Sequence, residues 1–138
     1  MREVFREVSS LAIYNPVIDK ILLQDRTSIS KYGEEVTFFG GWLDEWETPL
    51  QAAQRESNEE LKTNFDTYHY LWQFIHDKEG KDYIRNLFFV LTSQEIFQDE
   101  EWDGAVRLSL DEAKTKKFTT DMEQEFIAIE RYLDNQKR

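Results

Sequence analysis

Hydrophobic residues along the chain fall into short runs that are separated by polar or turn-forming residues. Runs rich in Val, Ile, Leu and aromatic residues are typical of strands, and Asn15 with Pro16 favours a turn between the first two runs. Two longer runs flank residues 77–81, which we expect to form a hairpin loop. The predicted strands cover residues 8–14, 20–26, 36–39, 66–76, 83–92 and 105–110.

One segment in the middle of the chain carries strong helix signals. Thr48 can cap a helix that begins at Pro49, and Gln51 completes a capping box. We expect this helix to run to about Leu61. The side expected to pack on the sheet carries Leu50, Ala53, Ser57 and Leu61.

Two further helices are expected near the end of the chain. Asp111 is the expected cap of a short helix, and a longer one begins at Thr120 or Asp121 and reaches Leu133 with apolar residues at helical spacing. Strands interleaved with few helices predict an α/β (α+β) fold, in which a mixed central sheet is covered by helices on both faces. A chain of 138 residues fits one domain, which we expect to span residues 1–138.

The composition narrows the class of protein. The chain is 40% hydrophobic, which allows a core, and it has no Cys, which excludes disulfides and thiolate metal sites. No apolar run approaches the length of a membrane span, so no membrane partner is expected, and the expected location is the cytoplasm. The net charge of −11 argues against long nucleic acid as a partner. A small anionic substrate is repelled too, so a phosphate-bearing substrate needs a bound cation as a bridge.

Three carboxylates share one edge of the central helix. At about 100° per residue, Glu56, Glu59 and Glu60 fall within a sector of about 100°. Like charges at this spacing repel, and Arg55 relieves the repulsion only in part. Clustered carboxylates suit hard divalent cations, which can contact phosphate oxygens and activate water. A solvated helix face is the alternative interpretation.

The wider spacing favours the metal-binding interpretation. A Gly, a Glu, an Arg-Glu pair and a Glu-Glu pair follow one another at fixed intervals: Gly41, Glu47, Arg55, Glu56, Glu59 and Glu60. This arrangement resembles the Nudix box, the signature of the Nudix hydrolase family, and the flanking strands resemble the layout of MutT-like members. The resemblance implies a Nudix-type α/β/α sandwich and a hydrolase that acts on phosphorus-containing anhydrides.

Three positions depart from the family pattern. Ser57 replaces an apolar residue, and its hydroxyl can donate to the carbonyl of Ala53. Lys62 replaces the Gly that normally ends the helix in a left-handed conformation. Because Lys costs about 1 kcal/mol or more there, we expect the helix to end one or two residues later, near Asn64. Thr63 replaces the last apolar residue, and none of these changes removes a carboxylate.

The resemblance also implies roles for individual residues. The ligands of Mg²⁺ or Mn²⁺ would be Glu56, Glu59, Glu60 and the backbone carbonyl of Gly41. Glu47 and Arg55 would join the preceding loop to the helix, with Arg55 orienting the carboxylates. The catalytic residues would be Glu47, Arg55, Glu59 and Glu101.

A carboxylate from a later loop often completes the site in this family, as metal ligand or general base. Glu101 is the preferred candidate here, with Glu100 as the alternative and a merely solvated acidic loop as another. Arg26 matches an Arg of MutT-like members and would contact phosphate, unless it is a surface Arg at a strand end.

Aromatic residues flank the box and could stack on a nucleobase: Phe39, Trp42, Trp46, Trp102 and Phe118. For each of them a core or merely partly exposed position is the favoured interpretation, and we take Phe39 and Trp42 as the candidates for substrate binding. His69 and His76 lie an odd number of positions apart on one predicted strand, so we expect them on opposite faces and neither as a metal ligand.

Three functions are compatible with these residues. The short chain and Arg26 favour a MutT-like pyrophosphatase of nucleoside triphosphates. Another Nudix enzyme could act on a dinucleoside polyphosphate, a nucleotide sugar or capped RNA; the lack of a Pro after Pro49 argues mildly against the ADP-ribose branch. A catalytically silent module would bind a nucleotide and regulate a partner, but it need not keep the three carboxylates. The substrate, the phosphorus attacked and the oligomeric state, for which a homodimer is one alternative, are left open.

Overall fold

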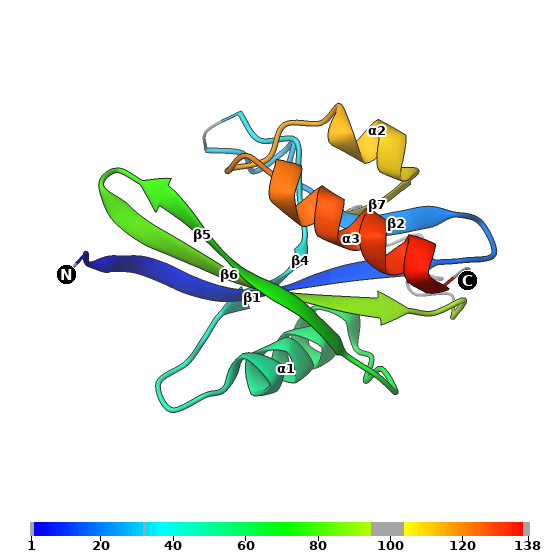
Figure 1. Ribbon diagram of the computed structural model, residues 1–138, viewed down its shortest axis with the longest axis horizontal. Coiled ribbons are helices and arrows are strands. Elements are labelled where there is room, and N and C mark those ends of the chain that lie inside the picture. Colours follow the sequence, from blue (N-terminus) through cyan, green and yellow to red (C-terminus); the bar gives the residue numbers. More distant parts are fainter. Residues whose placement is uncertain (1, 32, 95–103, 137–138) are drawn as a thin grey trace.

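The computed structural model describes residues 2–31, 33–94 and 104–136. A central sheet separates two helical layers, with α1 (Pro49–Leu61) on one face and α2 (Leu110–Lys114) and α3 (Glu123–Gln136) on the other (Figure 1). This arrangement confirms the mixed sheet with helices on both faces that the sequence predicts. Within the described ranges, no helix is both long and apolar enough to cross a membrane.

The sheet is built around β1, which pairs with three other strands. Its members are β1 (Val4–Asn15), β2 (Lys20–Asp25), β3 (Val36–Thr37), β4 (Phe39–Trp42), β5 (His69–Lys78), β6 (Lys81–Leu91) and β7 (Ala105–Leu108). The strand order is β3-β2-β1-β6-β5, while β4 also pairs with β1 and β7 with β2. The β1–β6 pair is parallel and the other pairs are antiparallel. Because α1 packs against β1 and β4, the short strand β4 is held directly beside that helix.

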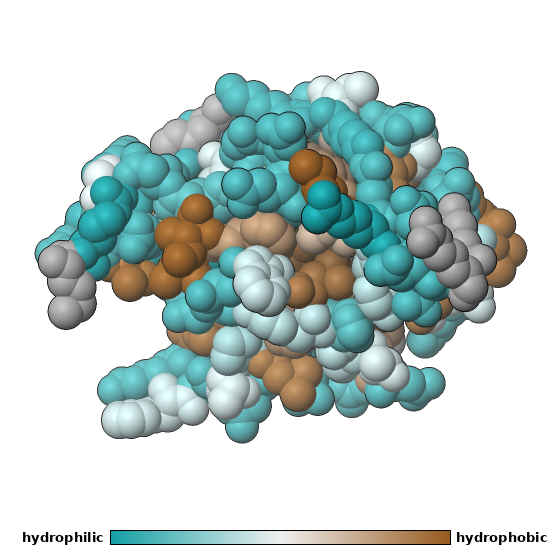
Figure 2. Space-filling model, viewed as in Figure 1, coloured by the Kyte–Doolittle hydropathy of each residue, from teal (hydrophilic) through white to brown (hydrophobic). Residues whose placement is uncertain are grey.

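Alternation along β1 divides the core into two layers. Leu11 and Ile13 belong to the cluster that packs against α1, whereas Ala12 and Tyr14 belong to the cluster that packs against α2 and α3. Figure 2 shows hydrophilic residues over most of the visible face, with smaller hydrophobic groups between them.

The predicted hairpin between β5 and β6 is confirmed, but its loop is shorter than the expected residues 77–81. The strands reach Lys78 and restart at Lys81, which leaves a two-residue turn. Glu79 and Gly80 both have positive φ, 54° and 82°, as a type I′ turn requires. This turn matches the twist of the two strands, so pairing continues to its edge.

The two C-terminal helices begin at other residues than predicted. Ser109, not Asp111, caps α2, because the Ser109 hydroxyl accepts from the Glu112 N–H at 3.1 Å and the Glu112 carboxylate accepts from the Ser109 N–H. α3 begins at Glu123, since the Asp121 carboxylate already accepts the Glu123 N–H at 3.1 Å from outside the helix.

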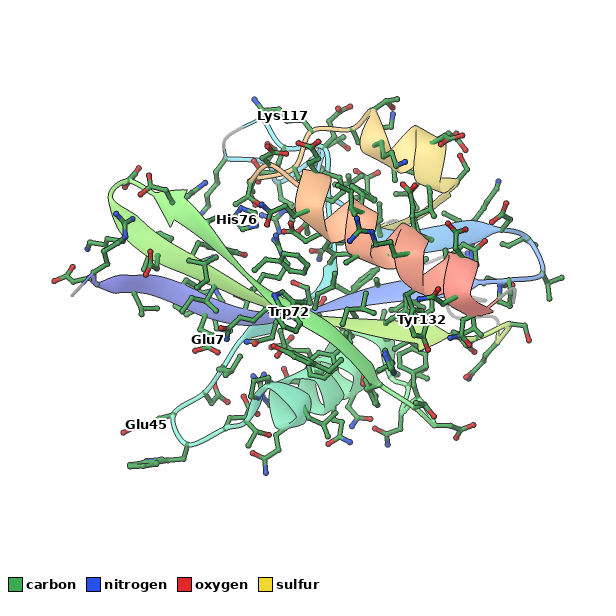
Figure 3. All side chains as sticks on the ribbon, viewed as in Figure 1. Glu7, Glu45, Trp72, His76, Lys117 and Tyr132 are labelled. Atoms are coloured by element: carbon green, nitrogen blue, oxygen red, sulfur yellow. The ribbon has the colours of Figure 1, made fainter. Side chains whose placement is uncertain are left out.

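Both histidines of β5 face α3, which corrects the prediction that they lie on opposite faces. His76 Nε2 lies 2.7 Å from Glu125 Oε2, and the His69 ring lies 4.5 Å from the ring of Tyr132 (Figure 3). The register of β5 against β6 shifts between these two histidines. An extra residue in one strand reverses the alternation of its side chains, which local spacing does not reveal.

Candidate active site

The start of α1 is fixed by the capping box that the sequence predicts. The Thr48 hydroxyl accepts from the Gln51 N–H at 3.1 Å, and the Gln51 side chain accepts from the Thr48 N–H at 2.9 Å. Pro49 occupies the first turn. The buried residues are Ala52, Ala53, Ser57 and Leu61, so the packing face is rotated slightly from the predicted one, and Leu50 is exposed.

Ser57, which stands where the family has an apolar residue, is fully buried and makes polar contacts. Its Oγ donates to the carbonyl of Gln54 at 2.9 Å rather than to Ala53, and it lies 2.6 Å from the hydroxyl of Tyr68. The Tyr68 hydroxyl also accepts the Phe65 N–H at 3.1 Å. The polar residue therefore ties the helix to the chain that follows it.

The end of α1 lies at Leu61, so the expectation of a later end near Asn64 is wrong. Lys62 itself adopts the left-handed conformation, with φ 53° and ψ 33°. The Lys62 and Thr63 N–H groups donate to Asn58 and Ser57 carbonyls, and Lys62 Nζ donates to the Glu59 carbonyl. These bonds offset the conformational cost of roughly 1–2 kcal/mol, because they satisfy carbonyls that a helix end leaves unpaired.

Arg55 connects the acidic edge of α1 to the loop that precedes the helix. Its Nε and Nη2 donate to both carboxylate oxygens of Glu47, at 2.8 and 2.9 Å, and Nη2 also donates to the Trp42 carbonyl at 2.8 Å. Nη1 donates to Glu56 at 2.7 Å and lies 3.4 Å from Glu59. Hydrogen bonds to Glu47 raise the pKa of Arg55, and the same bonds lower the pKa of Glu47. The pair stays charged and holds the loop against the helix.

Two consecutive glycines bring β4 close to its neighbours. Gly40 has a φ of 139°, and any side chain there would collide with the carbonyl of Ser9 on β1. At Gly41 a Cβ would lie 2.6 Å from the Cδ of Glu56. The Glu56 carboxylate therefore occupies the space that a side chain at residue 41 would need.

Glu60 is the carboxyl group most affected by its surroundings. Burial raises its pKa to about 8, assisted by its hydrogen bond with Glu56 and by the charges of Glu56 and Glu59, while Arg26 acts in the opposite direction. Three negative charges on one helix edge cannot all be held at low cost without a cation. At neutral pH and without a cation, Glu60 therefore holds a proton.

The donor set suits a hard divalent cation, although the carboxylates do not surround a common point. Among residues 2–31, 33–94 and 104–136, no three Asp, Glu or His side chains are placed to hold a metal ion together. Arg55 holds Glu56, and the Glu59 side chain is 60% exposed. A cation shared by these carboxylates would need Glu59 beside Glu56 and Glu60, and it would take the place of the proton on Glu60.

The acidic edge lines an open hollow of about 670 Å³ between α1, β4 and the end of β2. Arg26 and Trp42 line it, together with residues that sequence reasoning missed: Gln24, Asp44 and Lys62. Arg26 Nη2 lies 3.5 Å from the buried carboxylate of Glu34, which anchors one end of its guanidinium. A phosphate chain in this hollow would meet Arg26 and the carboxylate edge at the same time.

The remaining predicted site residues are distributed differently. Phe39 is fully buried in the cluster between the sheet and α1, so it presents no surface to a substrate. Phe118 packs in the opposite cluster, 5.8 Å from the ring of Phe38, and Trp46 is 92% exposed at a turn. The candidates in the acidic loop, Glu100, Glu101 and Trp102, lie outside the described residues.

A buried ion pair on the α3 side of the sheet was also missed. Arg85 Nη1 donates to Glu125 Oε2 at 2.8 Å, and both side chains are almost fully buried. Burial alone would raise the pKa of Glu125, but the hydrogen bond from His76 and the charge of Arg85 outweigh it and lower the pKa. A lone Arg in an apolar strand indicates a buried partner, although its position in α3 is not visible in local sequence.

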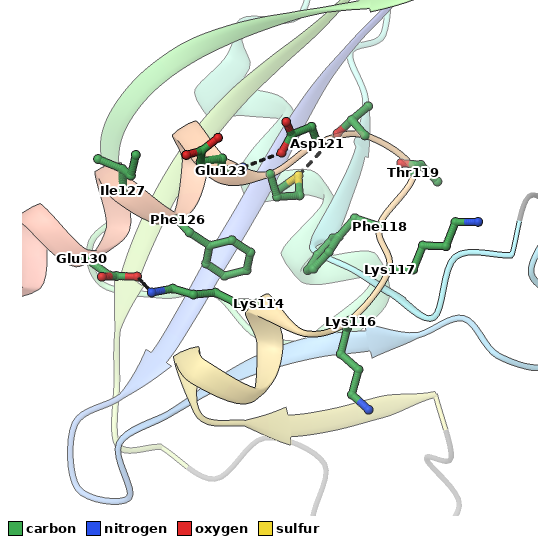
Figure 4. A pocket seen from close by; sticks show the side chains of 12 residues that line it. Lys114, Lys116, Lys117, Phe118, Thr119, Asp121, Glu123, Phe126, Ile127 and Glu130 are labelled. Carbon is green, nitrogen blue, oxygen red and sulfur yellow. Dashed lines mark hydrogen bonds and ion pairs between the residues drawn. The ribbon is translucent and has the colours of Figure 1, made fainter.

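A hollow somewhat larger than the one at the acidic edge lies away from these residues, beside α2 and α3 (Figure 4). It measures about 740 Å³ and is lined by α2, the loop after it and the first turns of α3. It shares no lining residue with the hollow at the acidic edge. Size alone therefore does not locate the chemistry of this protein.

Comparison with known proteins places this arrangement in a family. A sequence model of the NUDIX domain matches residues 4–128, while no curated protein matches the chain. The ORF135 protein of E. coli has a similar structure, with a TM-score of 0.70, 23% identity, and coverage of 97% of this chain and 92% of that one. A mutT/nudix family protein from Listeria innocua has a TM-score of 0.73 and 17% identity, with coverage of 98% of this chain and 98% of that one. The Ap4A hydrolase of C. elegans has a TM-score of 0.69 and 18% identity, with coverage of 93% of this chain and 98% of that one.

At these identities the structures show the common fold, and the family model shows the relationship. The NUDIX domain spans the sheet, α1, α2 and the first part of α3, so it includes the acidic edge and the loop joined to it. The chain therefore belongs to the Nudix family and is a hydrolase of phosphorus-containing anhydrides.

Proposed function

We propose that this protein uses Mg²⁺ or Mn²⁺ to hydrolyse the diphosphate linkage of a nucleoside triphosphate or a related nucleotide derivative. The contact between Gly41 and Glu56 carries the proposal, because a residue without a side chain leaves room for a carboxylate at the edge of an open hollow. Nudix hydrolases generally depend on divalent metal, and the oxygen donors here suit Mg²⁺ and Mn²⁺.

The carboxylates of α1 would hold the cation, with Glu56 and Glu60 partly buried at the base and Glu59 at the exposed rim. When bound, the cation supplies charge stabilisation to the phosphate oxygens and activates a water. Glu59, whose side chain is 60% exposed, is our candidate for accepting a proton from that water. Glu101, outside the described residues, remains the candidate for a further carboxylate.

The residues around the carboxylates would position the substrate. Glu47 fixes Arg55, and Arg55 in turn holds Glu56 in place. Arg26 would contact phosphate oxygens, and Trp42, which is 58% exposed at the rim, would contact the nucleoside part. The lack of Cys agrees with a cytoplasmic location, and the net charge of −11 means that an anionic nucleotide needs a bound cation as a bridge.

A panel of substrates tests the proposal. Purified protein with Mg²⁺ or Mn²⁺ should release pyrophosphate or monophosphate from at least one nucleoside triphosphate, dinucleoside polyphosphate or nucleotide sugar. The Glu59→Gln variant should lose at least about a hundredfold in kcat while its thermal unfolding is unchanged.

Glu45 provides a matched control in the same acidic region. It is exposed and points outward from the loop before α1 (Figure 3), and it does not line the hollow. Glu45→Gln removes the same charge and should retain full activity. Tight nucleotide binding without turnover of any substrate in the panel would instead favour a silent regulatory module.

A further inference from the structure

A second cavity, of about 210 Å³, adjoins the hollow at the acidic edge. The two share Gln24, Arg26, Gly40, Gly41 and Trp42 as lining residues, so a ligand in one can extend into the other. The second cavity lies on the α3 face of the sheet, where Ser10 and Arg85 contact each other at 3.0 Å. It is smaller than the roughly 300–1,000 Å³ typical of sites for whole drug-sized ligands. One chemical group, not a whole nucleotide, fits this volume.

Arg6 is the unusual residue of this cavity. Its guanidinium carbon lies over the indole ring of Trp42, 3.9 Å from the ring centroid, which is a cation–π contact. Its Nε is buried and has no hydrogen-bond partner within the described ranges. Buried donors without an acceptor are rare in proteins, because each costs the hydration it has lost.

The charge of Arg6 also lacks a counter-ion in the part of the chain that is described. The other two arginines of the cavity are paired, Arg26 with Glu34 and Arg85 with Glu125. No Asp or Glu is among the described lining residues. In a protein with a net charge of −11, an unneutralised and partly buried guanidinium is a local site for an anion.

Hydroxyl groups surround the same space. Ser10 Oγ accepts from Arg85 Nε at 3.0 Å, which leaves the Ser10 hydroxyl proton available to another acceptor. The hydroxyls of Tyr83 and Thr119 belong to side chains that line the cavity from two further directions. Donors that converge from several sides match the oxygens of a phosphate better than the two oxygens of a carboxylate.

We propose that the Arg6 cavity binds a phosphate group of the substrate, so that this protein favours substrates whose negative charge extends beyond the diphosphate being cleaved. Longer polyphosphate chains and nucleotides with an additional phosphate belong to this class. The statement about substrates rests on the proposed function, whereas phosphate binding at Arg6 does not. Arg6 is here the residue that determines specificity.

Titration of metal-free protein with inorganic phosphate in EDTA tests the binding directly. Phosphate should shift the side-chain N–H signals of Arg6 in ¹H–¹⁵N spectra, and Arg6→Gln should weaken binding about tenfold or more. Arg6→Lys, which keeps the charge, should bind more tightly than Arg6→Gln. Arg131→Gln removes an equal charge from an exposed position on α3 and should leave the affinity within about twofold of wild type.

Three results would overturn the proposal. Acetate or adenosine would bind as tightly as phosphate, or Arg6→Gln would bind phosphate as tightly as wild type. The third is a loss of phosphate affinity in Arg131→Gln as large as in Arg6→Gln. With Mg²⁺ present, Arg6→Gln should raise KM for nucleoside triphosphates more than for the matching diphosphates. Failure of the whole substrate panel would refute the proposed function but not phosphate binding in EDTA. Normal turnover with an unchanged KM ratio would refute the specificity alone.

Discussion

Replacing Gly41 by Ala is expected to weaken divalent-cation binding while the fold survives. A Cβ at this position would lie 2.6 Å from the Cδ of Glu56, closer than the ~3.5 Å at which two carbon atoms attract each other. The φ of Gly41 lies outside the left-handed region, so the backbone accepts Ala without strain. The carboxylate is the end of a flexible side chain, and it should turn away while β4 stays in place.

The size of the effect follows from what Glu56 loses. Turning away breaks the 2.7 Å hydrogen bond from Arg55, and hydrogen bonds to charged groups contribute roughly 1.5–3 kcal/mol. Replacing Gly by Ala also stabilises the folded protein by about 0.4–1 kcal/mol, because the unfolded chain loses conformational freedom. The free energy of unfolding should therefore fall by roughly 0.5–2.6 kcal/mol. Cation affinity should fall by at least about tenfold, because a proposed ligand leaves its position.

Manganese titrations followed by electron paramagnetic resonance measure the affinity, and thermal unfolding measures the stability. The control is a double-mutant cycle: in a Glu56→Ala background, Gly41→Ala should have no further effect on affinity, since the carboxylate that it displaces is absent. Wild-type manganese affinity in Gly41→Ala would refute this reasoning. So would an equal loss of affinity in the Glu56→Ala background.

Three further predictions concern the same helix. Arg55→Lys should lose the two hydrogen bonds that Arg55 donates to the Glu47 carboxylate. The variant should have a kcat at least about tenfold lower and a free energy of unfolding roughly 1–3 kcal/mol lower. Wild-type values in kinetics and thermal unfolding would contradict this. In EDTA, the free energy of unfolding should decrease as pH rises from about 4.5 to about 8, because folded Glu60 binds its proton more tightly than the unfolded chain does. Urea unfolding across this pH range should show a smaller slope in Glu60→Gln, and an identical slope would exclude Glu60 as the cause. Ser57→Ala and Tyr68→Phe should each cost about 1 kcal/mol, with a double variant that costs less than the sum; full additivity would show that the two hydroxyls are not coupled.

Local sequence patterns were sufficient for the elements that position the site. The capping box at Thr48 and Gln51 predicts the start of α1 correctly, because its bonds join residues three positions apart. The spacing from Gly41 to Glu60 indicates the family, which the NUDIX match shows. Residue 41 is a glycine because the carboxylate of Glu56, fifteen positions later, occupies the space that a side chain would need. This contact becomes visible only in the three-dimensional structure.

Other features depend on contacts between distant segments. Lys62 takes the left-handed conformation because bonds at the helix end offset its cost, against the propensity of the isolated residue. The register shift in β5 places both of its histidines on the same face of the sheet, and no residue type in the sequence marks the shift. Arg85 finds its partner Glu125 forty positions away, so sequence could indicate only that some partner exists.

An anomalous difference map from crystals soaked in Mn²⁺ tests the central claim most directly. We expect a peak beside the carboxylates of Glu56, Glu59 and Glu60, with Glu59 turned inward from its exposed position. A manganese peak away from this helix, or side chains that stay in place with no peak between them, would contradict the account.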